Sequence, residues 1–197
     1  MLADSAPVGQ IIPAGGGEPT RVTRTGFALG ARWRPDGKAL AVTEFGSQAQ
    51  GVARIYVVSL GGGKPAQVTS EGYGAGPDWG PDGRRIVLNL HTGSGFDIAV
   101  VNSDGTGLRK FGTAESWEVS PYWSPDGAAI AFLSKAPGNW EVALLDPSTG
   151  EIRILTTTPG DEGDPHWTPD GKSLVFSSQD DSHKLVSVRV EGLLRQE

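Results

Sequence analysis

The amino-acid sequence predicts an all-β protein, a β-propeller of four-stranded antiparallel blades, and three observations support this prediction. A Trp-x-Pro-Asp-Gly motif occurs four times, beginning at Trp33, Trp79, Trp123 and Trp167, with spacings of 46, 44 and 44 residues. A short apolar run follows each copy, and two further strand-like segments complete each period without any helical periodicity. A fixed period of this length is typical of repeat architectures in which each repeat forms one blade.

The repeated motif predicts a tight hairpin turn. Proline fixes φ near the value that the second position of a type I turn requires, and aspartate suits the third position. Glycine then accepts the left-handed conformation of a G1 bulge. Positive φ angles are therefore expected at Gly37, Gly83, Gly127 and Gly171.

The segments after each turn predict three more strands per repeat. The second strand has three consecutive apolar positions in every copy, which is typical of a strand buried on both faces. We expect second strands at residues 40–42, 86–88, 130–132 and 174–176, third strands at 54–58, 97–101, 141–145 and 184–188, and fourth strands at 66–69, 108–111 and 151–155. The motif tryptophan is then expected to be a large wedge between neighbouring sheets. A β-sandwich is the competing fold, but it requires no identical turn at a fixed period.

Three segments carry a resemblance to a known family. They are Pro121-Tyr-Trp-Ser-Pro-Asp-Gly127 with the apolar run after it, Ile55-Tyr-Val-Val58, and Asp104-Gly-Thr-Gly-Leu-Arg109. Together they resemble the repeat of TolB-like β-propellers, a relative of WD-type repeats, over about residues 15–190. The resemblance implies a non-enzymatic binding or scaffold module that docks a protein or peptide at one ring face. It also implies a bacterial, periplasmic or cell-envelope setting, with a peptidoglycan-associated lipoprotein as the partner of TolB itself.

Two other functions stay open at this point. Similar repeats form the gating propeller of prolyl-oligopeptidase-like serine peptidases, so the chain could be the non-catalytic part of such an enzyme. It could also be a structural subunit of a larger complex. The natural reading frame beyond Glu197 would separate the peptidase hypothesis from a free-standing binding module.

Composition excludes several classes of function. The chain has 197 residues, a net charge of −6 and no cysteine, so neither a disulfide nor a thiolate metal site can form. The negative charge argues against general nucleic-acid binding. No window is long and apolar enough to suggest membrane insertion, and residues 1–20 show no signal peptide. The three histidines occupy non-equivalent repeat positions, so no metal or other cofactor is expected.

The chain ends raise the question of ring closure. Residues 11–23 align with a third and a fourth strand, whereas no fourth strand follows 184–190. We expect 1–17 to be an N-terminal extension, 18–192 the propeller and 193–197 a tail. The segment 20–24 would then pair with 184–190 and close four blades into a ring; the alternative is an arc of a larger ring, which could self-associate. Closure of the ring, or head-to-tail pairing of two chains, would also bring opposite charges together. The basic residues of the first repeat would then face the acidic residues of the last: Arg21, Arg24, Arg32 and Arg34 on one side, and Asp161, Glu162, Asp164 and Asp170 on the other.

Aromatic and charged residues recur just before each motif, where propeller channels open. Phe27, Tyr73, Trp117 and Asp161 stand six residues before the tryptophans; Arg32, Asp78, Tyr122 and His166 stand immediately before them; Glu118 and Glu162 lie in the same segments. The sequence therefore predicts a peptide or protein contact surface at one mouth of the channel. The alternative is that the aromatic rings pack between blades and the charges are solvated.

No catalytic motif is present in the sequence. A G-x-S-x-G motif is absent, and Gly93-Ser94-Gly95 lacks the required spacing. Neither a phosphate-binding loop nor a dinucleotide fingerprint is found. We therefore expect no catalytic residues and no enzyme activity from this chain.

Overall fold

The computed structural model confirms the all-β fold. It describes residues 9–23, 28–45, 52–70, 72–91, 93, 95–112, 117–136, 138–179 and 184–190. These residues form seventeen β-strands and no helix, so the described part of the chain offers no helix that could cross a membrane.

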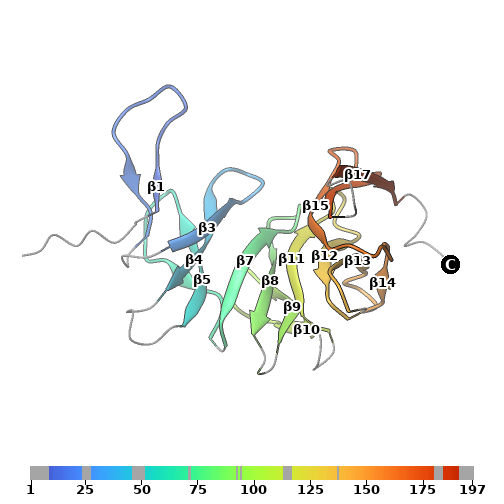
Figure 1. Cartoon of the computed structure of the whole chain (residues 1–197). Coiled ribbons are helices and arrows are strands. Elements are labelled where there is room, and N and C mark those ends of the chain that lie inside the picture. The colour runs from blue at the N-terminus through green and yellow to red at the C-terminus, as the bar shows by residue number, and fades with distance from the viewer. Residues whose placement is uncertain are drawn as a thin grey trace, which may run out of the picture.

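Fifteen of the strands form four antiparallel sheets, one for each repeat (Figure 1). The first blade contains β3 (Ala28–Trp33), β4 (Ala39–Phe45), β5 (Ala53–Ser59) and β6 (Ala66–Gln67). The second contains β7 (Gly74–Trp79), β8 (Arg85–His91), β9 (Phe96–Asn102) and β10 (Arg109–Phe111). The third contains β11 (Glu118–Trp123), β12 (Ile130–Ser134), β13 (Glu141–Leu145) and β14 (Ile152–Ile154). The fourth has three described strands, β15 (Glu162–Trp167), β16 (Ser173–Ser178) and β17 (Lys184–Arg189).

The four repeated turns have the predicted geometry. Gly37, Gly83, Gly127 and Gly171 have φ angles of 69°, 66°, 73° and 69°, in the left-handed region that glycine adopts without strain. Each turn joins the first strand of a blade to its second strand. The turns of all four blades therefore lie at the same end of their first strands.

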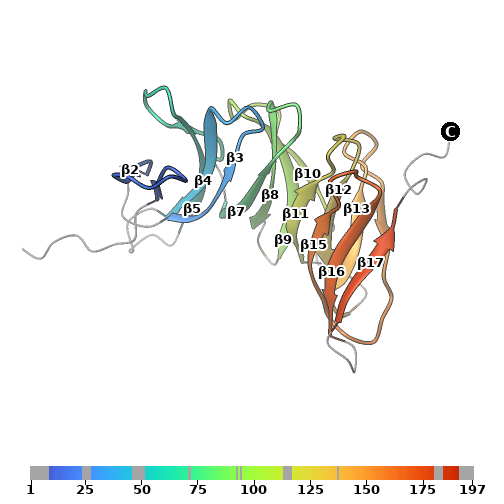
Figure 2. The ribbon, with the colours of Figure 1, turned by 90° about the horizontal axis from the view of Figure 1, so that it is seen from above.

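Apolar side chains fill the space between neighbouring blades. In the third blade every residue of β12 and β13 is buried, which explains the continuous apolar runs in the sequence. One buried cluster joins the first and second blades, another the second and third, and a further cluster the third and fourth. Figure 2 shows the sheets following one another side by side in an arc.

The motif tryptophans sit at these junctions, with one exception. Trp79 and Trp123 are only 4% and 6% exposed, and Trp167 packs against the cluster between the third and fourth blades. The indole Nε1–H groups of Trp79 and Trp167 donate to main-chain carbonyls of the preceding blade, each over 3.1 Å. Trp33 is 51% exposed, so the expectation of a buried wedge is wrong there. Among the described residues, no four-stranded blade lies on that side of the first one.

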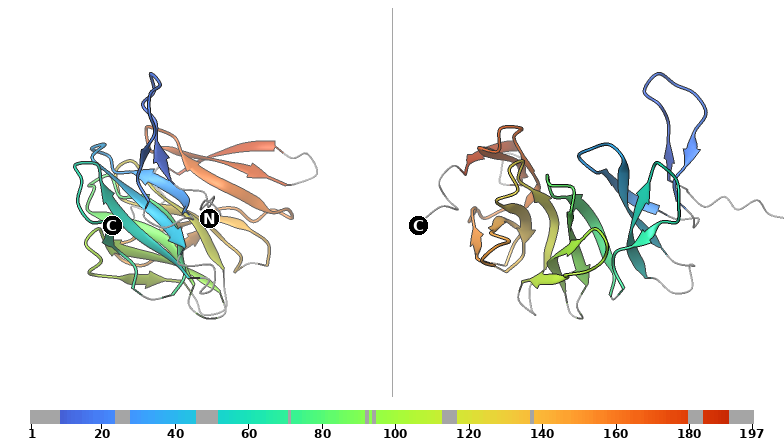
Figure 3. Two further views of the ribbon diagram at one scale, coloured as in Figure 1. Left: turned by 90° about the vertical axis from the view of Figure 1, so that its left-hand side faces the viewer. Right: turned by 180° about the vertical axis from the view of Figure 1, so that it is seen from behind.

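Of the two arrangements that the sequence left open, closure of the ring by residues 20–24 is not shown, and the described strands form an open arc. β2 (Thr20–Arg21) pairs with β1 (Gln10–Ile11) and not with β17. The resulting hairpin lies against the first blade, where Ile11 and Val22 pack on Leu40 and Val42. Local pairing across one short loop costs less chain entropy than pairing with a strand at the far end of the chain. Figures 1 and 3 show β1 and β17 at opposite ends of an open arc.

Candidate functional site

The innermost strands β3, β7, β11 and β15 are neighbours around the channel axis. Each carries one variable side chain immediately before its tryptophan: Arg32, Asp78, Tyr122 and His166. The Arg32 Nε lies 4.0 Å from an Asp78 carboxylate oxygen, and its Cζ lies 5.7 Å from the centre of the Tyr122 ring. The Tyr122 and His166 rings are 4.5 Å apart between centroids. Four residues from four blades therefore form one continuous group, which we name the channel-mouth cluster.

The predicted site residues that stand six positions before each tryptophan lie at the other end of the innermost strands. Tyr73, Trp117 and Asp161 directly precede β7, β11 and β15, whereas the channel-mouth cluster lies near the ends of those strands. Five residues of extended chain span roughly 16 Å. The structure therefore does not bring the two sets together at one mouth. Phe27, the fourth predicted residue of this set, lies outside the described residues.

The two glutamates of the predicted surface are not surface residues. Glu118 and Glu162 begin β11 and β15 and are each only 3% exposed. The Glu162 carboxylate accepts hydrogen bonds from the hydroxyls of Thr158 (2.7 Å) and Ser178 (3.2 Å). Ser134 donates to Glu118 over 3.4 Å. Buried carboxylates that are held in this way orient neighbouring segments and are poorly placed to contact a large partner.

A row of backbone bulges lines the channel, and sequence reasoning missed it. Each innermost strand shifts register halfway along, and the residue at the shift has positive φ: Gly30, Gly76, Ser120 and Asp164. Serine and aspartate at φ angles of 54° and 44° are uncommon, because such positions usually need glycine. A hollow of about 150 Å³ lies among the first three of these bulges, Arg32 and Tyr122. The sequence contained one signal of these bulges, which is the glycine three residues before Trp33 and Trp79.

Asp78 is the partly buried acid of the channel-mouth cluster. Burial raises the pKa of its carboxyl above the ordinary value, while the hydrogen bond from the Trp123 main-chain N–H (2.9 Å) and the Arg32 guanidinium act in the opposite direction. The cluster thus combines a partly buried acid, a guanidinium and two aromatic rings. Such a mixture can orient a peptide through both polar and ring contacts.

A second aromatic group occupies the opposite end of the channel strands. The rings of Phe45, Tyr73, Phe96 and Trp117 contact one another in sequence, with centroids 5.7, 6.0 and 5.5 Å apart. Trp117 is 44% exposed, and the other three rings are partly buried. Most of this group therefore fills the junctions between the first three blades, as the alternative of packing between blades proposed.

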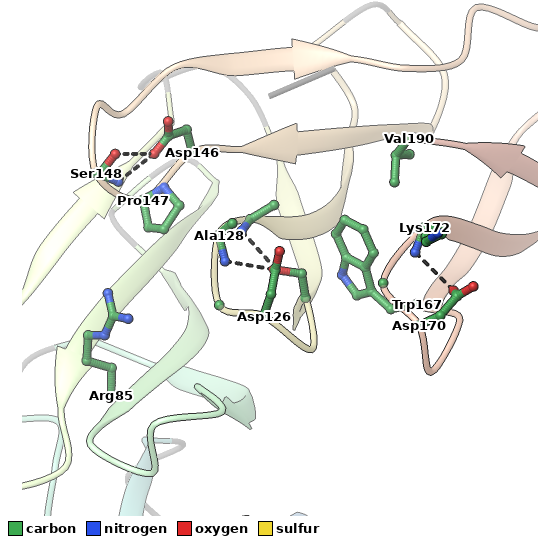
Figure 4. Close-up of a pocket in the computed structure, with 14 residues that line it drawn as sticks. Arg85, Asp126, Ala128, Asp146, Pro147, Ser148, Trp167, Asp170, Lys172 and Val190 are labelled. Atoms are coloured by element: carbon green, nitrogen blue, oxygen red, sulfur yellow. Dashed lines mark hydrogen bonds between the residues drawn. The ribbon is translucent and has the colours of Figure 1, made fainter. Parts of the chain in front are cut away.

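The described residues hold no group of three histidine or acidic side chains that is arranged to bind a metal ion. A pocket of about 570 Å³ lies on the turn side of the third and fourth blades (Figure 4).

Comparison with known proteins agrees with this architecture. The sequence profile of the TolB β-propeller domain matches residues 15–197. The chain belongs to the TolB β-propeller family. The match covers all four TolB-type repeats, including the turns and the channel-mouth cluster. A search of curated protein sequences gives no significant match.

Several solved structures share the TolB-type propeller. TolB from Acinetobacter baumannii is 20% identical, with a TM-score of 0.74 over 93% of this chain and 46% of that one. A TolB-type protein from Agrobacterium tumefaciens is 27% identical, with a TM-score of 0.69 over 86% of this chain and 61% of that one. A puromycin-hydrolyzing peptidase from Mycobacterium tuberculosis is 15% identical, with a TM-score of 0.77 over 97% of this chain and 35% of that one. The chain therefore spans from about a third to three fifths of these proteins.

Proposed function

We propose that this chain is a non-enzymatic binding module that docks a protein or peptide partner at the channel-mouth cluster. The observation that carries the proposal is the convergence of Arg32, Asp78, Tyr122 and His166 from four successive blades. Arg32 and Tyr122 belong to the first and third blades, so their contact spans the second blade. Arginine and tyrosine are enriched among residues that dominate binding energy at protein interfaces.

Two further features support the proposal. The channel-mouth side chains stand on strands that pair with the mostly buried strands β4, β8 and β12 and with β16, so the binding groups would be held rigidly before a partner arrives. Rigid presentation lowers the entropy lost on association. We place the boundaries of this module at residues 18–192. Membership of the TolB family suggests that the partner is a protein and not a small substrate.

The proposal is tested by placing a photo-crosslinking phenylalanine derivative at Tyr122 in cells. The matched control carries the same group at Tyr56, another half-buried tyrosine, on β5, the third strand of the first blade. We expect crosslinks to a discrete protein from position 122 and none from position 56. With that protein purified, Tyr122→Ala and His166→Ala should each weaken binding about tenfold or more, whereas Tyr56→Ala should not. Equal crosslinking from both positions, or none from position 122, would refute the proposal.

A second candidate function follows from the match to the mycobacterial peptidase, whose TM-score of 0.77 is the highest of the three structures described. In that case the chain would be the non-catalytic propeller of a peptidase. A hydrolase domain in the same reading frame would establish this alternative. Crosslinks from Tyr122 would then go to that domain or to a peptide substrate.

A further inference from the structure

The 150 Å³ hollow at the channel contains polar side chains that have no partner within the described protein. Its walls come from the three innermost strands β3, β7 and β11 and from Asn89 on β8. The side chains of Asn89, Ser120 and Tyr122 line it, and each residue is half-buried. None of these three side chains takes part in a hydrogen bond with another described residue. Partly buried groups of this kind are available to a ligand.

Arg32 is the only charged side chain among the residues that line the hollow. Its Nε lies 4.0 Å from one oxygen of Asp78, whose other oxygen accepts the Trp123 main-chain N–H over 2.9 Å. Within the described part of the chain, the one hydrogen bond of the guanidinium is a long one, 3.3 Å from Nη1 to the main-chain oxygen of Ala31. Asp78 therefore lies at the Nε side of the guanidinium and leaves Nη2 without an acceptor. A guanidinium in this state favours a negatively charged ligand.

The backbone at Ser120 gives a second, independent indication. Its φ angle is 54°, in the left-handed region, whereas glycine occupies the equivalent bulges at Gly30 and Gly76. Serine in this conformation costs free energy that glycine avoids. Strained residues cluster at functional sites. What serine adds here is one hydroxyl group at the wall of the hollow.

We propose that the hollow binds a carboxylate of the partner, from an acidic side chain or from a C-terminus, through the Arg32 guanidinium, the Ser120 hydroxyl and the Asn89 amide. Arginine binds a carboxylate through two parallel hydrogen bonds, and a hydroxyl and an amide N–H can donate to its remaining lone pairs. A volume of about 150 Å³ admits a carboxylate on a short aliphatic stem. The inference rests on the proposed function, because it names the chemical group that the partner inserts at the channel mouth.

The experiment titrates the full ¹⁵N-labelled chain with two pairs of acetylated tripeptides. The first pair is trialanine with a free C-terminal carboxylate and the same peptide with a C-terminal amide. The second pair is amidated and carries aspartate or asparagine between two alanines. The signals followed are the Arg32 Nε–H and the Ser120 main-chain N–H, assigned with the variants Arg32→Lys and Ser120→Gly.

We expect at least one acidic peptide to shift both signals saturably, and its neutral twin to bind at least about tenfold more weakly. Binding of the free trialanine acid alone would identify a C-terminus as the source of the carboxylate. Binding of the aspartate peptide alone would identify an acidic side chain.

A matched pair of glycine variants separates binding from folding. Ser120→Gly removes the hydroxyl and the strain together, so it should weaken binding of the acidic peptide about threefold to tenfold without lowering the melting temperature. Asp164→Gly relieves the same kind of strain, at a φ of 44°, in a residue that does not line the hollow. It should not weaken binding.

A second pair tests the charge. Arg32→Gln should weaken binding of the acidic peptide at least about tenfold, as followed by the Ser120 signal. Arg34→Gln removes the same charge from the same blade, outside the hollow, and should change binding by less than about twofold because exposed charges are screened.

Other results would overturn the inference. Equal binding of the acidic and neutral peptides would show that the carboxylate is not recognised, and so would the absence of any shift at tens of millimolar peptide. Undiminished binding by Ser120→Gly and Arg32→Gln would place the carboxylate elsewhere. The two proposals fail separately. Crosslinks from position 122 without binding of an acidic peptide would refute only the carboxylate, whereas no crosslinks from position 122 would refute the docking function.

Discussion

Truncating Trp123 to alanine, next to the same change at Trp33, would measure how much a complete blade junction stabilises the arc. Each tryptophan precedes a copy of the same turn motif, and both substitutions remove the same atoms. They differ in surroundings, because Trp123 is 6% exposed and Trp33 is 51% exposed. The pair therefore isolates the contribution of the neighbouring blade.

The expected magnitude follows from the buried area. A tryptophan can bury about 250 Å², so the difference in exposure corresponds to roughly 110 Å² of additional buried surface at Trp123. At about 25 cal/mol per Å² this gives a difference of ~2.8 kcal/mol between the two variants. The cavity left between two blades brings the total cost of Trp123→Ala to about 3–5 kcal/mol. Trp33→Ala should cost about 1–2 kcal/mol.

Urea unfolding, followed by circular dichroism, gives both free energies of unfolding. A cost below about 1 kcal/mol for Trp123→Ala would refute the wedge. Equal costs at both positions would show that Trp33 is covered in solution. Light scattering over a series of protein concentrations would then show whether a second copy of the chain provides the cover.

Three further predictions concern the turns, the channel and the N-terminal hairpin. Gly127→Val should destabilise the chain by about 1–3 kcal/mol, because φ at this position is 73° and an added Cβ would lie 3.0 Å from a neighbouring proline ring. The control is Gly15→Ala, where an added Cβ would have no atom within 4 Å, so the melting temperature of the protein should change little. Because the pKa of Asp78 is raised, its carboxyl stabilises the fold while protonated and loses that effect as the pH rises through the raised pKa. Asp78→Asn should therefore gain thermal stability relative to the unchanged protein as the pH rises above the ordinary carboxyl pKa of 3.8. Asp36→Asn removes a carboxyl of lowered pKa, so it should lose thermal stability relative to the unchanged protein as the pH rises toward 3.8 from below. A chain without residues 1–23 should keep its circular dichroism spectrum, and its free energy of unfolding should fall by only about 1–3 kcal/mol, because the hairpin covers just one face of the first blade. Global unfolding of this shortened chain would show instead that these residues close the ring.

The turn geometry could be predicted from the sequence because it depends on local chemistry. Proline, aspartate and glycine restrict the backbone within four residues, and Gly37 and Gly171 adopt the same conformation in very different surroundings. Burial of the tryptophans could be predicted only where a neighbouring blade exists. Trp33 carries the same motif as Trp123, so no local signal separates the exposed ring from the buried one.

The candidate site could be predicted only in part, because it depends on direction along a strand. The residue before each tryptophan stands out in the sequence as a recurring variable position, and the structure groups these four residues together. Tyr73 and Trp117 were grouped with it because the repeat alone does not tell which end of the first strand they occupy. Ser120 gave no signal of its positive φ, since a serine in a strand-like segment usually adopts an extended conformation.

The hydrogen bonds at the blade junctions have a consequence for how this surface can diversify. The indole of Trp79 bonds to the main-chain oxygen of Arg32, and that of Trp167 bonds to the main-chain oxygen of Tyr122. Every amino acid supplies that oxygen, so the anchor survives any side chain at the acceptor position. The four equivalent positions in this chain already hold an arginine, an aspartate, a tyrosine and a histidine. Mutation of Arg32 or Tyr122 could therefore change what the channel mouth recognises without breaking these two anchors. Asp78 differs, because its carboxylate itself accepts the hydrogen bond from the Trp123 main-chain N–H across the second junction.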